Sequence, residues 1–126
     1  MDQNDVEPKE VVMSYIEALD NQRYEKAAGL LDDDVRIRGP AGENFGKPLD
    51  FVRMLRAYRS KYDVKKVFAD GEDVCVLYDL IIGGSAVYTS SWYQVKHGKI
   101  VSVDTIFDPN KMGPPPKSDP ARGAFR

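Results

Sequence analysis

The first 60 residues carry apolar side chains at helical spacing. A helix is predicted from Pro8, because proline suits the first turn of a helix, and its apolar stripe comprises Val12, Tyr15, Ile16 and Leu19. A second amphipathic segment runs from Tyr24 to Leu31, and a third helix is predicted from Pro48 to Tyr58. The segment 32–34 interrupts the pattern, 35–38 alternates like a short strand, and 41–47 is interpreted as a loop.

From Val64 onward the hydrophobic period shortens to two, which predicts strands. The expected strands span 64–69, 74–82, 85–96 and 100–107, and turn residues separate them at 70–71, 83–84 and 97–98. Helices followed by an antiparallel meander predict an α+β fold, with the helices on one side of a curved sheet.

Hairpin geometry assigns side chains to the two faces of this sheet. A two-residue turn at Gly83-Gly84 places Tyr78 opposite Thr89 and Val74 opposite Tyr93. Both faces are then substantially apolar, whereas a sheet with one solvated face would alternate cleanly. One face is expected to cover the core and the other to meet a partner, with Tyr88 and Trp92 central to a homodimer interface.

The last strand has two possible registers. A two-residue turn at His97-Gly98 places Asp104 opposite Ser91, on the face that covers the core. A bulged Gly98 shifts the register by one residue. The residues that then point inward are Val101, Val103, Thr105 and Phe107. Apolarity favours the second register, and the register decides whether Asp104 can reach an interior pocket.

Composition narrows the class of protein. The 126 residues are 42% hydrophobic and 30% charged, which is typical of one globular domain; we assign it to residues 6–108, with a proline-rich tail at 109–126. With 18 basic and 20 acidic residues, no nucleic-acid partner is expected. One cysteine, an acidic amino-terminal segment and the lack of a long apolar run predict a cytoplasmic protein without membrane contact.

The order of several weak motifs resembles the nuclear transport factor 2-like superfamily, in particular its SnoaL-like (polyketide-cyclase-like) branch. The motifs are VVMSYIEALDNQRYEKAAGLL, DDDVRI, FGKPLDFVRML, ADGEDVCVLYDL and SSWYQVKHGKIVSVDTIFDP, which together cover about residues 8–110. The resemblance implies a cone (cystatin-like, or nuclear transport factor 2-like): three N-terminal helices on a strongly curved mixed, mostly antiparallel sheet around an apolar pocket. Members include steroid isomerases, scytalone dehydratases, epoxide hydrolases, cyclases and non-catalytic adaptors, and many are homodimers.

The resemblance to steroid isomerases also assigns individual positions. Their oxyanion-binding tyrosine falls on Tyr15, their second oxyanion donor on Ser91, and their general-base aspartate on Gly39. Glycine cannot abstract a proton, so that mechanism is disfavoured. The epoxide-hydrolase arrangement of an arginine between two aspartates is not visible on the pocket face either.

These observations predict a pocket for a small apolar or oxygenated ligand. The candidate catalytic residues are Asp104 and Tyr15. The candidate ligand-binding residues are Phe51, Tyr58, Tyr78, Ser91, Tyr93 and Phe107. Chemistry, if any, would be cofactor-free acid–base isomerisation, cyclisation or dehydration, without a metal; the alternative is a non-catalytic dimeric binding or adaptor module. Tyr15 can equally be a core residue, and Asp104 can instead pair with an arginine or lie in the dimer interface.

Overall fold

The computed structural model describes residues 6–40 and 42–111. Three helices pack on one sheet: α1 (Pro8–Asp20), α2 (Tyr24–Gly29) and α3 (Pro48–Tyr58). The strands are β1 (Leu31–Gly39), β2 (Gly42–Phe45), β3 (Lys61–Asp70), β4 (Asp73–Ile82), β5 (Ser85–Lys96) and β6 (Lys99–Ile106). A short 3-10 helix, η2 (Pro109–Lys111), follows β6. The predicted tail thus begins with this turn, and its remainder, 112–126, lies outside the described residues.

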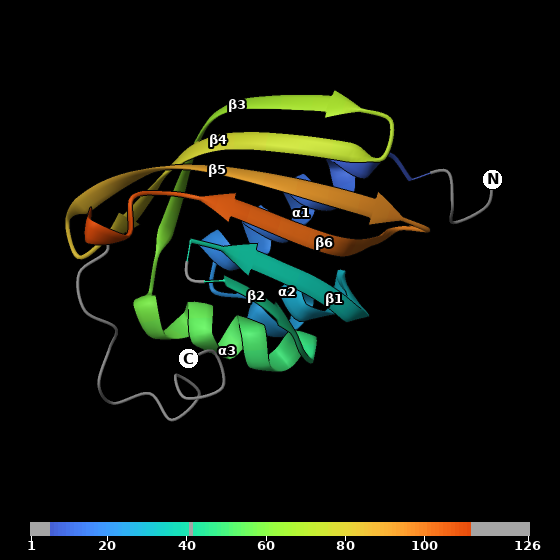
Figure 1. Ribbon diagram of the computed structural model, residues 1–126, viewed down its shortest axis with the longest axis horizontal. Coiled ribbons are helices and arrows are strands. Elements are labelled where there is room, and N and C mark those ends of the chain that lie inside the picture. Colours follow the sequence, from blue (N-terminus) through green and yellow to red (C-terminus); the bar gives the residue numbers. More distant parts are fainter. Residues whose placement is uncertain (1–5, 41, 112–126) are drawn as a thin grey trace.

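The six strands are arranged in the order β2-β1-β6-β5-β4-β3. β1 and β6 are parallel, and the other neighbouring pairs are antiparallel. Figure 1 shows the sheet curving around α1, with α3 near β1 and β2 and leading directly into the start of β3. β2 and β3 form opposite edges and do not pair, so the cone stays open. The predicted α+β fold, with three helices on a curved mixed sheet, is confirmed.

The helix α1 supplies much of the core. Pro8 occupies its first turn, as expected, and one side of the helix is buried against the sheet, including Val12, Tyr15 and Leu19. Fully burying one such aliphatic side chain stabilises the fold by about 1.5–3 kcal/mol. Asp20 ends the helix and joins it to β3, since its Oδ1 accepts a hydrogen bond of 2.9 Å from the backbone N–H of Tyr62. No helix in the described ranges is long and apolar enough to cross a membrane.

The hairpin of β4 and β5 has the predicted register. Ile82 pairs with Ser85, Tyr78 with Thr89, and Val74 with Tyr93. Gly83 and Gly84 both have positive φ, 55° and 88°, which matches the tight turn that the two glycines indicated. The inner face of both strands is buried, whereas Tyr88 and Trp92 on the outer face remain 62% and 42% exposed.

The register of β6 is the second of the two alternatives, but its cause differs from the expected one. His97 and Gly98 form a two-residue turn, since Lys96 pairs with Lys99 and both turn residues have positive φ, 53° and 77°. The bulge lies further on: Val95 pairs with Ile100 and Gln94 with Ser102, so Val101 is the extra residue. The prediction that Gly98 carries the bulge was wrong. Ile100, which is fully buried, points inward where Val101 was expected to do so, and Val101 is the bulged residue instead.

Two further expectations around β1 are corrected. The second helix ends at Gly29, and Leu31 already pairs with Ile100 in the sheet. β1 then bulges over the three aspartates before Arg36 resumes pairing with Ser102, which explains why the alternation is visible only from Val35. The segment 41–47 is not simply a loop, because β2 pairs antiparallel with β1 within it. Gly42, at φ 133°, permits the tight reversal between β1 and β2. The sequence did not reveal this strand because the segment has no alternating apolar residues.

Candidate functional site

A chain of hydroxyl groups crosses the inner face of the sheet. The Tyr78 hydroxyl on β4 lies 2.9 Å from Ser91 Oγ on β5, and Ser91 Oγ lies 2.9 Å from Thr105 Oγ1 on β6. Either partner can donate in each hydrogen bond. The paired strands hold these three residues in one row, because Ser91 and Thr105 are direct partners and Val76, two residues before Tyr78, faces Ser91.

Four tyrosines surround this chain. The rings of Tyr15 and Tyr93 meet edge to face with their centroids 6.0 Å apart, and those of Tyr62 and Tyr78 are tilted together at 5.5 Å. The four residues come from α1, β3, β4 and β5, so the cluster exists only in the folded chain. We refer to Tyr15, Tyr62, Tyr78 and Tyr93 as the tyrosine cluster.

Burial keeps these hydroxyls in their neutral form. Desolvation raises the pKa of Tyr78 to about 12, against an opposing effect of its hydrogen bonds to Ser91 and Tyr93. Burial, reinforced by the neighbouring Tyr78, raises the pKa of Tyr15, Tyr62 and Tyr93 well above the usual value as well. At neutral pH the tyrosine cluster therefore offers hydrogen-bond donors and no negative charge.

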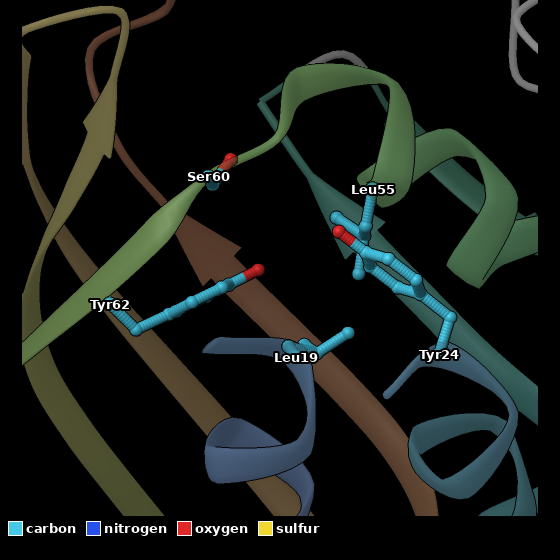
Figure 2. Close-up of a pocket in the computed structure, with 5 residues that line it drawn as sticks. All are labelled: Leu19, Tyr24, Leu55, Ser60 and Tyr62. Carbon is cyan, nitrogen blue, oxygen red and sulfur yellow. The ribbon is translucent and has the colours of Figure 1, made fainter. Parts of the chain in front are cut away.

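A narrow crevice reaches the cluster from the helical side. It is lined by Leu19, Tyr24, Leu55, Ser60 and Tyr62 and leaves no room for a water molecule. Figure 2 shows the rings of Tyr24 and Tyr62 directed from opposite sides toward the space between them. No described residue hydrogen-bonds to the hydroxyls of Tyr24, Ser60 or Tyr62. The crevice thus combines apolar walls with donors that have no protein partner in the described part of the chain.

The structure brings together some of the predicted site residues and separates others. Tyr15, Tyr78, Ser91 and Tyr93 lie in or beside the tyrosine cluster. Phe51 is buried in the core, Tyr58 is half-buried on α3, and Phe107 packs against the core edge. Sequence reasoning missed Tyr62, because the strand was begun at Val64; the alternation Tyr62, Val64 is the signal that extends it inward.

Asp104 lies on the outer face, away from the tyrosine cluster. It pairs with Trp92 across the ladder, and its Oδ1 lies 2.9 Å from Nε of Arg38. Its Oδ2 lies 3.6 Å from a terminal nitrogen of Arg36. The arginine pairing that the sequence left as an alternative is therefore present. The N–H of Arg38 is not aligned for a hydrogen bond, and Oδ1 of Asp104, although buried, accepts none from any described residue.

Gly39 leaves space beside the hydroxyl chain. The alternation of β1 places it on the inner face, since its neighbour Arg38 points outward to Asp104. A Cβ atom built on Gly39 would meet Thr105 O at 3.8 Å, an ordinary contact. The position has room for a side chain, but the sequence supplies no carboxylate there.

An α+β fold in which a curved sheet wraps around a long helix, with polar groups on the concave face of the sheet, is the architecture of the nuclear transport factor 2-like superfamily. The family model described as a SnoaL-like domain matches residues 12–103, and the chain belongs to this family. The resemblance inferred from the motif order is thus confirmed. None of the curated proteins matches the chain.

Solved structures show the same fold. An NTF2-like protein of unknown function from Cytophaga hutchinsonii is 29% identical, with a TM-score of 0.76 over 82% of this chain and 91% of that one. A candidate ketosteroid isomerase from Kribbella flavida is 23% identical, with a TM-score of 0.74 over 88% and 84%. A candidate polyketide cyclase from Pseudomonas putida is 20% identical, with a TM-score of 0.70 over 84% and 95%. At these identities the last two similarities establish the fold alone.

Proposed function

We propose that this protein binds a small, uncharged, largely apolar molecule with at least one oxygen atom, between the helices and the concave face of the sheet. The main support is the crevice, where the hydroxyls of Tyr24, Ser60 and Tyr62 have no partner among the described residues. Since the crevice holds no water-sized space, binding requires its walls to move apart and let a ligand oxygen accept a hydrogen bond from one of these hydroxyls.

The electrostatics of the interior favour an uncharged ligand. The tyrosine cluster stays neutral because burial raises the pKa of each hydroxyl. Among the described residues Asp104 is the one buried carboxylate, and it faces outward. A charged ligand placed here would lack a counter-charge, and burying an unpaired charge is far more costly than burying a carbonyl that accepts a hydrogen bond. A ketone, ester or alcohol on an apolar frame suits the site best.

The second candidate is cofactor-free isomerisation, cyclisation or dehydration of such a molecule. The SnoaL-like family and neighbours described as a candidate isomerase and a candidate cyclase support it. Tyr15 or Tyr78 would donate to the developing oxyanion. Proton abstraction also needs a base within reach, and the described carboxylates do not supply one: Asp104 lies on the other face, and Asp20 is held by Lys61 and the Tyr62 backbone. Binding without chemistry, as in an adaptor, is therefore the function that the geometry supports best.

A homodimer through the outer face is a further part of the proposal. Four large apolar side chains are exposed on the strands of the sheet: Phe68, Tyr88, Trp92 and Ile106. Large exposed apolar side chains on one face of a sheet are typical of interaction sites. We propose a second copy of the chain as the partner on this face. The cytoplasm, with its reducing conditions, is the proposed location for a chain with one cysteine.

The test of ligand binding is native mass spectrometry of freshly purified protein, followed by titration with acetophenone, a small aromatic ketone. We expect a co-purified small molecule or saturable ketone binding, and Tyr62→Phe should weaken ketone binding about five-fold, as the loss of one neutral hydrogen bond does. Tyr88→Phe is the matched control, since Tyr88 lies on the opposite face. The absence of both a bound molecule and saturable binding, or equal effects of the two substitutions, would refute the proposal.

A further inference from the structure

We propose that a recess on the outer face of the sheet receives the Tyr88 side chain of a second copy of the chain, whose hydroxyl donates a hydrogen bond to Asp104. This inference rests on the proposed homodimer and names the contact that completes it. The recess has a volume of about 280 Å³ and lies over β1, β5 and β6. Its lining includes Arg38, Pro40, Trp92, Asp104, Ile106 and Phe107.

The carboxylate of Asp104 lacks a hydrogen-bond donor. Its side chain is nine-tenths buried, and neither of its oxygens accepts a hydrogen bond from a described residue. Arg38 and Arg36 lie beside it, with nitrogens at 2.9 Å and 3.6 Å, so its charge is already balanced. A buried acceptor without a donor costs free energy. Because Asp104 lines the recess, a donor that enters there can reach the carboxylate, and this donor need not carry a charge.

The walls of the recess favour an aromatic ring. Pro40, Trp92 and Ile106 are apolar, and a cavity of about 150 Å³ already accommodates a benzene ring. Tyrosine combines such a ring with a neutral donor. Tyr88 is the one exposed tyrosine among the described residues, at 62%, and no described residue hydrogen-bonds to its hydroxyl. The chain therefore carries, on the same sheet face, both the recess and a side chain that suits it.

Two-fold symmetry allows the two copies to exchange this contact. In a two-fold dimer both copies use the same surface, so Tyr88 of each copy must meet the recess of the other. Tyr88 and Trp92 lie on the outer face of β5, two residues to either side of Ser90. A two-fold axis that crosses β5 at Ser90 places Tyr88 of one copy over Trp92 of the other. Asp104 pairs with Trp92 across the ladder, so the carboxylate lies beside that position.

Sedimentation equilibrium over a series of concentrations measures the dimer dissociation constant of each variant. Tyr88→Phe keeps the ring and removes the hydroxyl. Each dimer contains the contact twice, so we expect the dissociation constant to rise about a hundredfold, tenfold for each contact. Ile106→Ala removes a wall of the recess and should raise it at least tenfold. Leu49→Ala on α3 is the matched control for Ile106→Ala and should leave it unchanged; all three residues are exposed, so the variants retain the fold.

A double-mutant cycle tests the hydrogen bond itself. With Asp104→Asn the acceptor is neutral and the hydrogen bond weaker, so Tyr88→Phe should raise the dissociation constant only about tenfold in that background. Asp79→Asn is the matched control, because Asp79 is the cross-strand partner of Tyr88 within one copy. In the Asp79→Asn background the effect of Tyr88→Phe should remain about a hundredfold.

The outcomes distinguish this contact from the dimer as such. A native protein that stays monomeric at tens of micromolar would refute the dimer and the contact together. A native dimer whose dissociation constant does not change with Tyr88→Phe would overturn the contact alone. A hundredfold effect of Tyr88→Phe that persists with Asp104→Asn would also overturn it, since the hydroxyl would then have another partner.

Discussion

Single tyrosine side chains decide the chemistry of the interior. A tyrosine packed in an apolar core usually finds one partner for its hydroxyl, as Tyr78 does with Ser91. Tyr15 and Tyr62 are different, since no described residue hydrogen-bonds to either hydroxyl. Their rings pack against Tyr93 and Tyr78. Neutral donors without partners are suited to a ligand that brings an acceptor.

The raised pKa values of the tyrosine cluster predict how stability depends on pH. Each folded-state pKa lies above the unfolded value of about 10, so the stabilisation is fully present below pH 10 and is lost as pH rises through the folded pKa, about 12 for Tyr78. For Tyr78 alone the loss is of order 2 kcal/mol. We therefore expect the free energy of unfolding to fall steeply between pH 10 and 12.

Urea denaturation at a series of alkaline pH values measures this fall, and absorbance of tyrosinate measures the ionisation. Ionisation of the cluster and unfolding should occur together. If all seven tyrosines ionise near pH 10 while the protein remains folded, the hydroxyls are solvated and the neutral interior is refuted.

Hairpins and bulges determine which side chains reach which face. The turn at His97-Gly98 starts β6 in the register that would turn Asp104 inward, and the bulge at Val101 then reverses it. Ile100, Val103 and Thr105 consequently face the core, whereas Asp104 joins Arg36 and Arg38 on the outer face. One extra residue in a strand thus separates the candidate acid from the tyrosine cluster.

Glycines in strands and in turns are expected to respond oppositely to the same substitution. Gly39 lies in β1 with space around an added Cβ, so Gly39→Ala should stabilise the protein by about 0.4–1 kcal/mol by restricting the unfolded chain. Gly84 has φ 88° in the β4–β5 turn, so Gly84→Ala should cost about 1–2 kcal/mol. Urea midpoints of the two variants measure the difference. A destabilised Gly39→Ala would show that β1 packs more closely against β6 than described.

The molecule as a whole presents two apolar sheet faces, and the helices cover one of them. The uncovered face carries Tyr88 and Trp92 at its centre, together with the exposed Phe68 and Ile106. Its charged residues lie between these side chains, with Lys65 paired to Asp63 and Asp79. Aromatic side chains such as Tyr88 and Trp92 are enriched at interfaces.

Sedimentation equilibrium tests the proposed dimer. At tens of micromolar we expect a species of twice 14.2 kDa for the native protein. Tyr88→Glu should shift it to 14.2 kDa, because burying an unpaired carboxylate at the interface costs about 3–5 kcal/mol. Leu49→Glu provides the control, since Leu49 is an exposed apolar residue on α3, away from this face. A native protein that sediments at 14.2 kDa, or equal dissociation of both variants, would contradict the dimer.

Local patterns were sufficient for much of this protein. Apolar spacing located the three helices and the meander, and two glycines located the β4–β5 turn, because these features depend on neighbours along the chain. From those strands the residues of the inner face followed, including Tyr78, Ser91 and Tyr93. The motif order also identified the family.

Features that depend on distant pairing emerged only in the folded chain. β2 carries no alternating pattern and exists because β1 lies beside it, and the bulge at Val101 arises where β6 pairs with β5 on one side and β1 on the other. That bulge places the side chain of Asp104 on the outer face of the sheet. Side chains alternate along a strand, so a shift of one residue moves each of them to the other face. Tyr15, Tyr62, Tyr78 and Tyr93 meet across four elements for the same reason: their contacts are formed by tertiary packing, which the order of residues along the chain does not display.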